Sequence, residues 1–325
     1  MHTLILGGSG FIGFALAKQL ASEGHRLTLV DNLSRGKMDQ EFSEFLSQNP
    51  EFNFIELDLT EPIPGKLLPN KYNYVFLLAA VVGVKYTSEK PLDVLYTNTL
   101  IVKNVLDWFN DKSAKKLIYA STSETYAGSV ELGVAKIPTG ESVPLSIVDI
   151  FNPRFSYAIS KIWGEHAVIL AGEKAGFDFN IVRFHNIYGP RMGMEHVIPE
   201  LCLRAIKKEN PFKVFGTEQY RAFCYIEDAV KGLILVAKNS ETKRIINIGN
   251  DQEEIKISSL VDMILQLRDY TPKKEIHKSP VGSVSRRCPD LAKLKSIGFN
   301  PKFPLLKGLK LTYQWYKENG LKITE

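Results

Sequence analysis

The stretch that decides the fold is Thr3-Leu4-Ile5-Leu6-Gly7-Gly8-Ser9-Gly10-Phe11-Ile12-Gly13, close to the start of the chain. Its short apolar run reads as a buried strand, which passes directly into a glycine-rich turn and then into apolar residues at helical spacing. Gly7 permits a tight turn, Gly10 lets the backbone approach a pyrophosphate, and Gly13 allows close packing of the helix. Because the helix N-terminus adds a positive field, the turn predicts a phosphate-binding βα unit.

The residues that follow alternate short β-branched or aliphatic runs with longer amphipathic stretches, as βαβ units do. Strands are predicted at Thr3–Leu6, Arg26–Val30, Asn53–Leu57, Tyr74–Leu78, Leu117–Ala120 and Asn180–Phe184. Helices are predicted at Phe11–Ser22, Leu92–Phe109 and Ser156–Ala171, and Gly172 and Gly176 are expected to end the last one. The predicted fold class is α/β, with a Rossmann-type doubly wound parallel sheet.

After about Gly189 this alternation weakens, and prolines and glycines break the chain into short pieces. We therefore predict that residues 1–184 form a dinucleotide-binding domain, with a return to its sheet near residues 225–250. Residues 185–325 are predicted to form mainly a smaller C-terminal α/β region that binds the substrate.

The composition is that of a globular protein, with 44% apolar and 24% charged residues among 325. The net charge of +5 is spread along the chain, so no nucleic-acid partner is expected. Cys202, Cys224 and Cys288 are too few for a disulfide framework, and no cluster of residues has metal-ligand spacing. Without a leader or an apolar run of roughly 20 residues, we expect a cytoplasmic protein with no membrane contact and no metal.

Asp31 ends the second predicted strand about 20 residues after the glycine turn. Its carboxylate can accept hydrogen bonds from the adenosine ribose hydroxyls and would repel a ribose phosphate, which favours NAD as the cofactor. Asn32 is placed in the same cofactor set. Arg35 lies close by and could hold the extra phosphate of NADP, so NADP stays an alternative that Asp31 disfavours.

Tyr157 and Lys161 are four residues apart at the start of a predicted helix, so they share one face. An ammonium group stabilises a nearby phenolate and lowers the tyrosine pKa toward working pH. Such a tyrosinate can take the proton of a substrate hydroxyl while hydride leaves the same carbon. A second polar run, Ser121-Thr122-Ser123-Glu124-Thr125-Tyr126, follows a strand at its carboxyl end, where doubly wound sheets place their ligands.

Three further segments complete an ordered set, namely Asp58-Leu59, Leu78-Ala79-Ala80 and Arg183-Phe184-His185-Asn186-Ile187-Tyr188-Gly189-Pro190-Arg191. With this combination the whole chain resembles the extended short-chain dehydrogenase/reductase enzymes of the NAD-dependent epimerase/dehydratase group, which act on nucleotide-sugars. The resemblance implies that Asp58 and Leu59 flank the adenine, that Leu78, Ala79 and Ala80 line the cofactor, and that Thr122 hydrogen-bonds the reacting hydroxyl. Lys161 would also hold the nicotinamide ribose.

The same resemblance places Asn186, Arg221 and Arg287 where family members grip the diphosphate of the substrate. The planar fork of arginine suits this task because it meets phosphate oxygens bidentately. Arg191 is included in this predicted substrate set. For Arg287 a slip of one position, to Arg286, is left open.

Family members share the oxidation of C4 and then diverge. Thr122-Ser123-Glu124 resembles the sequence of GDP-mannose dehydratases and uronic acid decarboxylases, in which Ser123 and Glu124 join the catalytic set; Glu124 would act on C5 or only orient the substrate. Val82-Gly83-Val84 and Gly189-Pro190-Arg191 resemble several 4-epimerases instead. We expect a nucleotide-sugar 4-epimerase, with a dehydratase, a uronic acid decarboxylase and a C4 dehydrogenase or ketosugar reductase as alternatives. Ala127 departs from the family, which usually has glycine directly after this tyrosine.

A non-enzymatic NAD-binding sensor or scaffold is the remaining alternative. It is disfavoured because Thr122, Tyr157 and Lys161 are all present. The predicted helices Leu92–Phe109 and Ser156–Ala171 resemble the pair through which family members dimerise, so the resemblance implies a homodimer with an isologous contact.

Overall fold

The computed structural model describes residues 1–68, 71–109, 114–279 and 282–323. A seven-stranded sheet lies at its centre, in the order β11-β6-β5-β4-β1-β2-β3, and every adjacent pair is parallel. Its strands are β1 (His2–Leu6), β2 (Arg26–Asp31), β3 (Asn53–Glu56), β4 (Tyr72–Leu77), β5 (Ala114–Thr122), β6 (Asp178–Phe184) and β11 (Arg244–Ile248). The predicted doubly wound sheet is confirmed, and β11 adds a seventh strand to the six that were predicted.

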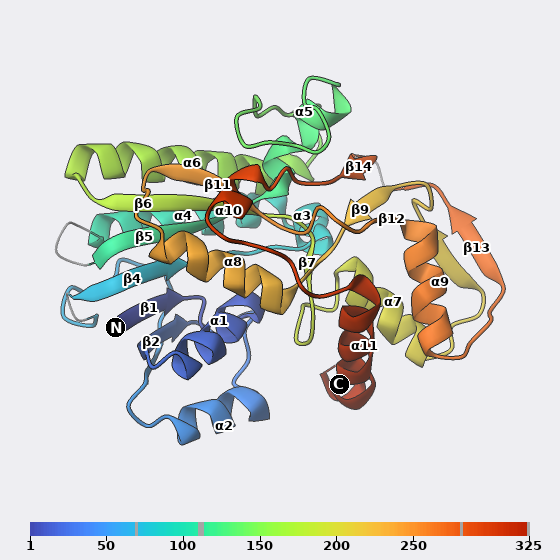
Figure 1. The fold of residues 1–325 in the computed structure, drawn as a ribbon, viewed down its shortest axis with the longest axis horizontal. Helices are drawn as coiled ribbons and strands as arrows, with labels where there is room; N and C mark the ends of the chain where they lie inside the picture. Colours follow the sequence, from blue (N-terminus) through green and yellow to red (C-terminus); the bar gives the residue numbers. More distant parts are fainter. Residues whose placement is uncertain (69–70, 110–113, 280–281, 324–325) are drawn as a thin grey trace.

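Helices cover both faces of this sheet (Figure 1). One face carries α1 (Phe11–Ser22) and α8 (Ile226–Lys238), and the other carries α4 (Pro91–Trp108) and α6 (Phe155–Ala175). Shorter helices lie in the connections: α2 (Gln40–Gln48), α3 (Val84–Glu89), α5 (Ala127–Glu131), α10 (Ala292–Ser296) and the 3-10 helix η1 (Ser123–Tyr126). Among the described residues, no helix is long and apolar enough to cross a membrane.

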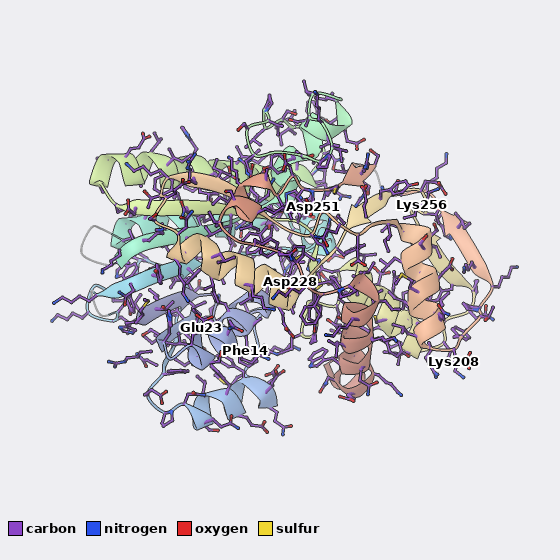
Figure 2. The ribbon with its side chains drawn as sticks, in the orientation of Figure 1. Phe14, Glu23, Lys208, Asp228, Asp251 and Lys256 are labelled. Atoms are coloured by element: carbon purple, nitrogen blue, oxygen red, sulfur yellow. The ribbon has the colours of Figure 1, made fainter. Side chains whose placement is uncertain are left out.

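The apolar run in β1 is buried on both faces of the sheet. Successive side chains of a strand point to opposite sides. Ile5 packs in the cluster that contains Phe14 of α1 (labelled in Figure 2), whereas Leu4 and Leu6 pack in the cluster that contains α4 and α6. A continuous apolar run is therefore what a central parallel strand requires.

The predicted helices correspond to α1, α4 and α6, but α6 runs past the residue where we expected it to end. Gly172 lies inside the helix and faces Phe179; a Cβ there would lie 2.4 Å from Cδ1 of that ring. Gly176 ends the helix in the left-handed region, with φ of 77°. The prediction that Gly172 ends the helix is wrong, because this glycine serves packing rather than capping.

The C-terminal region contains longer helices than the short pieces we expected. α7 (Val197–Ile206), α9 (Ile257–Leu267) and α11 (Leu305–Ile323) pack together at one end of the molecule (Figure 1). Three small sheets join them: β7 (Ile187–Tyr188) with β10 (Cys224–Tyr225), β9 (Tyr220–Ala222) with β12 (Glu254–Lys256) and β14 (Arg286–Arg287), and β8 (Phe212–Phe215) with β13 (Lys274–His277). Pro199 does not interrupt α7, because it lies in the first turn, where its missing N–H has no helical partner.

The segment from α8 to β11 returns to the central sheet near the predicted residues 225–250. Asp228 in the first turn of α8 (labelled in Figure 2) accepts hydrogen bonds from the backbone N–H groups of Lys302 and Phe303, each at 2.8 Å. These bonds fix the C-terminal segment against α8. The division at residue 184 into cofactor and substrate regions stays a prediction.

A buried ion pair joins α6 to β6 below the carboxyl ends of the strands. Arg183 donates to both carboxylate oxygens of Glu165, at 2.8 and 2.5 Å, and both side chains are nearly inaccessible to solvent. Ser121 also donates to Glu165, and Arg183 donates to the Tyr126 hydroxyl at 2.8 Å. Each charge is thus paired and hydrogen-bonded, as burial of a charge requires.

Arg183→Met should lower the free energy of unfolding by about 3–5 kcal/mol, because it leaves the Glu165 carboxylate buried without its partner. Urea unfolding measures this loss. Lys103→Met is the matched control, because Lys103 pairs with Asp107 on the surface and such pairs contribute about 1 kcal/mol or less. Equal, small losses in the two variants would contradict the role of the buried pair.

Candidate active site

A large cavity of about 430 Å³ opens where the parallel strands end. Its walls come from the glycine turn after β1, the carboxyl ends of β2 to β5, α6, and the segment after β6. Of the residues predicted from the sequence, it is lined by Gly7, Gly10, Phe11, Ile12, Gly13, Asp31, Asn32, Asp58, Leu59, Leu78, Ala79, Ala80, Thr122, Ser123, Glu124, Tyr157, Lys161, Asn186, Arg191 and Arg287. Only Arg221 of the predicted set lies elsewhere. The volume suits a small-molecule site.

The glycine turn leaves no room for side chains at two of its positions. A Cβ on Gly13 would lie 1.9 Å from the carbonyl oxygen of Gly7, and Gly7 itself has φ of 93°. Gly10 caps α1 without any side-chain hydrogen bond, so the first N–H groups of the helix have no side-chain acceptor. A bare helix N-terminus on a cavity wall fits a phosphate group, as the pyrophosphate of a dinucleotide requires.

Asp31 holds the turn together as well as lining the cavity. Its Oδ2 accepts from the backbone N–H of Ser9 at 3.1 Å, and its Oδ1 accepts from Leu33 N–H at 3.0 Å. A carboxylate has about four lone-pair directions, so acceptor capacity remains for ribose hydroxyls. Asp58, at the end of the next strand, has a pKa below its usual value because the backbone N–H of Thr60 donates to it.

Arg191 lies nearer to the glycine turn than to the substrate side. Its guanidinium pairs with Asp39 at 2.6 Å and reaches the carbonyl of Ser9 at 3.5 Å. It also lies 4.5 Å over the Phe14 ring. Arg191 therefore connects the segment after β7 to the loop that follows β2.

Arg35, the residue considered for NADP, donates to the Val82 carbonyl at the cavity wall.

Tyr157 and Lys161 lie in the first turns of α6, with the ammonium nitrogen 6.0 Å from the centre of the tyrosine ring. Lys161 donates to the carbonyl of Ala120 at 2.8 Å, and burial lowers its pKa to about 7 although Glu165 opposes this. Burial and the charge of Glu124 raise the pKa of Tyr157, while hydrogen bonding with Thr122 partly offsets them. The sequence predicted a lowered tyrosine pKa; in the chain without nucleotide the pKa of Tyr157 lies above its ordinary value, because burial and the charge of Glu124 outweigh the Thr122 hydrogen bond and the charge of Arg35.

Glu124 and Arg287 form an ion pair on the cavity wall, with Oε2 of Glu124 2.7 Å from an Arg287 nitrogen. Burial raises the pKa of Glu124, but the charges of Arg287, Arg154 and Arg221 outweigh burial, so its pKa lies below the usual value. Arg286 points elsewhere and pairs with Glu254 on the surface. The structure thus brings Arg287, and not Arg286, to the cavity.

Arg221 does not line the cavity in this structure. It donates to the Val284 carbonyl at 2.6 Å, to the Tyr220 carbonyl at 2.8 Å and to Gln219 at 3.1 Å. Its guanidinium is therefore already used to hold the backbone beside β14. Asn186 lines the cavity, and its amide donates to the Ala222 carbonyl at 3.1 Å.

Sequence reasoning missed Arg154, which lines the cavity and donates to Ser283 at 3.0 Å. The available signal was its place three residues before Tyr157, which puts both side chains on one face of α6. Within the described ranges, no group of three or more His, Cys, Asp or Glu side chains could hold a metal ion.

Known proteins match the chain over nearly its full length. Residues 3–249 match the NAD dependent epimerase/dehydratase family. The chain is 34% identical to the UDP-N-acetyl-alpha-D-glucosaminuronate decarboxylase of Bacillus cytotoxicus, over 97% of both chains. It is 29% identical to the UDP-glucuronate 4-epimerase of Thermodesulfobacterium geofontis, over 98% of this chain and 97% of that one. The crystal structure of a UDP-glucose 4-epimerase from Thermotoga maritima, with UDP-glucose, superposes with a TM-score of 0.83 at 26% identity, covering 98% of this chain and 99% of that one.

Lys161→Met should flatten the pH dependence of stability in protein without added nucleotide. The pKa of Lys161 is about 7 in the folded chain and ordinarily 10.5, so between these values the unfolded chain binds a proton that the folded chain lacks. Stability from this residue therefore rises with pH in that window, by up to roughly 1.4 kcal/mol per unit. Urea unfolding from about pH 7 to 9 measures the slope. An unchanged slope in Lys161→Met would contradict the assignment, and Lys103→Met is the exposed control.

Proposed function

Because the chain belongs to the NAD-dependent epimerase/dehydratase family, we propose that it decarboxylates a nucleotide-linked hexuronic acid after oxidising C4 of the sugar. That it is an NAD-dependent enzyme that modifies nucleotide-sugars follows from its relatives. The subtype and the roles of individual residues are the proposal. The observation that carries it is the ion pair of Glu124 with Arg287 on the cavity wall, close enough to Tyr157 for its charge to raise the tyrosine pKa.

NAD, when bound, supplies the reversible hydride acceptor that oxidation of C4 needs. In the proposal the bare N-terminus of α1 at Gly10 to Gly13 holds its pyrophosphate. Asp31 accepts from the adenosine ribose, Asp58 and Leu59 flank the adenine, and the wall at Leu78, Ala79 and Ala80 lines the remainder. The placement of all these residues around one cavity supports the assignment.

Tyr157 is the proposed base for the C4 hydroxyl. Thr122 hydrogen-bonds with it and would orient the same hydroxyl. Lys161 is anchored by the Ala120 carbonyl and would hold the nicotinamide ribose. The raised pKa of Tyr157 means that the phenol is neutral before substrate and cofactor bind. A cation brought next to the phenol would lower that pKa, since an opposite charge favours the ionised form.

A substrate carboxylate explains why arginines gather around Glu124. Arg154 and Arg287 both line the cavity, and both lower the pKa of Glu124. A hexuronate carboxylate would bind the same guanidinium groups, and arginine recognises carboxylates bidentately. Two of the relatives are named for reactions of UDP-linked uronic acids, one a decarboxylase and one a 4-epimerase.

Oxidation of C4 prepares such a substrate to lose carbon dioxide. Its carboxylate is attached to C5, beside the new carbonyl, so the electron pair of the C5–C6 bond can pass toward the C4 oxygen as carbon dioxide leaves. C5 then needs a proton, and C4 must take back the hydride so that its hydroxyl is restored and the cofactor is again oxidised. Glu124 is the proposed donor, because a substrate carboxylate that shares its arginines raises its pKa and favours the protonated form.

A 4-epimerase, which the sequence favoured, becomes the second candidate. Gly83 supports it, because this residue lines the cavity and a Cβ there would meet only Glu195 at 3.5 Å and Arg35 at 3.8 Å. The glycine leaves the wall open at a point where a ketosugar would need space to turn. The side chain of Val84 in the same run lies outside the part that the structure describes. We place decarboxylation first because epimerisation gives the Glu124–Arg287 pair no task.

A homodimer is proposed through α4 and α6. Leu92, Tyr96 and Leu100 on α4 are spaced four residues apart and are 42–57% exposed, and Trp163 and Leu170 on α6 are 43% and 52% exposed. This apolar stripe suits an isologous contact with a second copy. Sedimentation analysis should show a dimer, and a monomer would contradict the proposal. Asn186 and Arg287 remain the proposed contacts to the substrate, whereas Arg191 and Arg221, predicted with them, are held by Asp39 and by backbone carbonyls in this structure. A cytoplasmic location and the absence of nucleic-acid and membrane partners stay predictions.

The test is incubation of the purified chain with UDP-glucuronate, UDP-N-acetylglucosaminuronate and the matching uncharged UDP-sugars, followed by mass spectrometry and NMR. We expect loss of carbon dioxide from the uronic acids without stoichiometric NAD. Tyr157→Phe should lower kcat by about 10²- to 10⁴-fold while retaining NAD. An isomer of unchanged mass would establish epimerisation, and accumulation of NADH with a ketosugar would establish a dehydrogenase.

Glu124→Gln should lower the rate of carbon dioxide loss by about 10²-fold or more, because glutamine keeps the shape of the side chain and cannot deliver a proton. Oxidation of C4 should survive, so absorbance of reduced nicotinamide should build up in a single turnover. Glu173→Gln, at an exposed position on α6, is the control and should leave the rate unchanged. A full rate in Glu124→Gln would remove Glu124 from the mechanism.

A further inference from the structure

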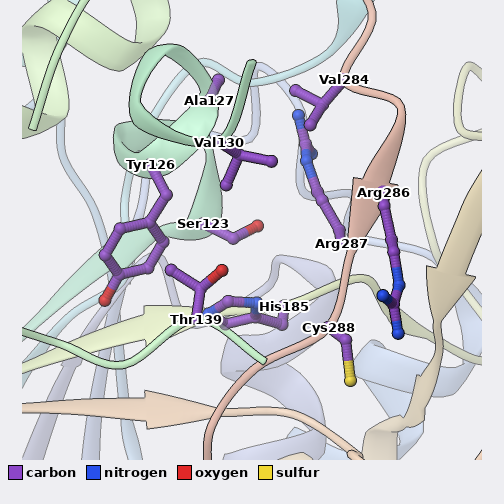
Figure 3. A pocket seen from close by; sticks show the side chains of 10 residues that line it. All are labelled: Ser123, Tyr126, Ala127, Val130, Thr139, His185, Val284, Arg286, Arg287 and Cys288. Atoms are coloured by element: carbon purple, nitrogen blue, oxygen red, sulfur yellow. The ribbon is translucent and has the colours of Figure 1, made fainter. Parts of the chain in front are cut away.

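A second, small cavity has Arg287, the partner of Glu124, in its wall, and Figure 3 shows the side chains that line it. Its volume is about 10 Å³, which is about the space that one buried water molecule occupies. Ser123, His185 and Arg287 contribute polar groups to its wall, and Ala127, Val284 and Cys288 contribute apolar ones. Arg287 lines both cavities, so its side chain spans the wall between them.

His185 lines this cavity and has one ring nitrogen without a hydrogen-bond partner among the described residues. Its Nε2 lies 3.1 Å from Oδ1 of Asn247. The Asn247 amide is oriented by donation of its Nδ2 to the carbonyls of Thr139 and Asp290, at 2.9 and 3.1 Å. Because the oxygen of Asn247 must accept, Nε2 of His185 carries the proton, and Nδ1 keeps its lone pair. Nδ1 is buried and makes no hydrogen bond to any residue that the structure describes.

Arg287 presents the complementary group, a free donor. One terminal nitrogen of its guanidinium donates to Glu124 at 2.7 Å. Its Nε is buried and has no hydrogen-bond partner among the described residues. Leaving a charged N–H group unsatisfied in the interior is costly, and native proteins satisfy such groups with protein or ordered water. Figure 3 draws the Ser123 hydroxyl between the His185 ring and the Arg287 side chain.

We propose that one ordered water molecule occupies this cavity, accepts from Nε of Arg287 and donates to Nδ1 of His185, so that His185 is a positioning residue for Arg287. The inference rests on the proposed function, because it gives Arg287 and Glu124 a role in turnover. The hydroxyl of Ser123 is the third group within the wall that can share the water. The water would hold the Arg287 guanidinium on the side of the small cavity, while Glu124 binds it on the side of the main cavity.

His185 remains a hydrogen-bond acceptor at working pH. The residue is 2% exposed. Burial lowers its pKa to about 3, and the charges of Arg287 and Arg183 contribute to this, although the hydrogen bond with Asn247 opposes it. The ring therefore stays neutral, and Nδ1 remains available. A protonated ring would turn Nδ1 from an acceptor into a second donor beside the cationic Arg287.

Two substitutions separate this role from a purely structural one. Asparagine at position 185 can place an amide oxygen near the site of Nδ1, whereas glutamine reaches the site of Nε2 and keeps only the contact with Asn247. We expect His185→Asn to retain kcat for UDP-glucuronate within a few-fold, and His185→Gln to lose on the order of tenfold, with KM unchanged in both. The reverse order, or equal losses, would overturn the proposal in favour of a scaffold role.

A second measurement requires no turnover. A high-resolution crystal structure of the full chain should show water density within hydrogen-bond distance of Nδ1 of His185 and Nε of Arg287. In His185→Gln the water should be absent or displaced. A dry cavity in the wild-type protein would overturn the inference. If the water is present and no UDP-sugar reacts, the proposed function fails and the water site stands.

Discussion

The bidentate contact between Glu165 and Arg183 holds the site in place. Glu165 lies one turn beyond Lys161 on α6, and Arg183 lies near the end of β6, shortly before the segment that carries Asn186. Two parallel hydrogen bonds fix the rotation of the helix relative to β6. Because Tyr157 and Lys161 share a helix face, one rotation sets both positions. The same carboxylate accepts from Ser121, directly before Thr122, so the strands β5 and β6 and the helix α6 meet at a single charge.

Several arginines surround the Glu124 carboxylate on the wall of the main cavity. Arg287 of β14 pairs with Glu124, and the charges of Arg154 at the N-cap of α6 and of Arg221 in β9 also act on it, so residues far apart in sequence create one electrostatic environment. The cluster has more cationic than anionic groups. An anionic substrate reduces that imbalance, whereas a neutral sugar leaves it unchanged. This excess of positive charge supports the proposal that the substrate is a uronic acid, independently of the likeness to the relatives.

The elements that sequence predicted well are set by local constraints. Gly13 is required by the Gly7 carbonyl six residues earlier, Gly7 is favoured by its own positive φ, and the helix after them begins at the predicted Phe11. Partners that lie far apart in the sequence could not be predicted. Arg221 carries the expected residue type, yet carbonyls more than 60 positions later occupy it. The end of α6 was misplaced because Phe179, in the next strand, decides what Gly172 does. Tyr157 was expected to have a lowered pKa because burial cannot be read from a four-residue spacing.

The ion pair between Arg191 and Asp39 bears on how bound ligands exchange. It ties the segment after β7 to the loop after β2, across the side of the cavity where the glycine turn lies. Arg191 is 9% exposed and Asp39 is 33% exposed in this pair, so separation of the two segments breaks a partly buried ion pair. A dinucleotide held at the glycine turn, as proposed, would lie beside this contact, whereas a sugar on the Glu124 side would not. Opening of this contact would then affect exchange of the cofactor more than exchange of the sugar.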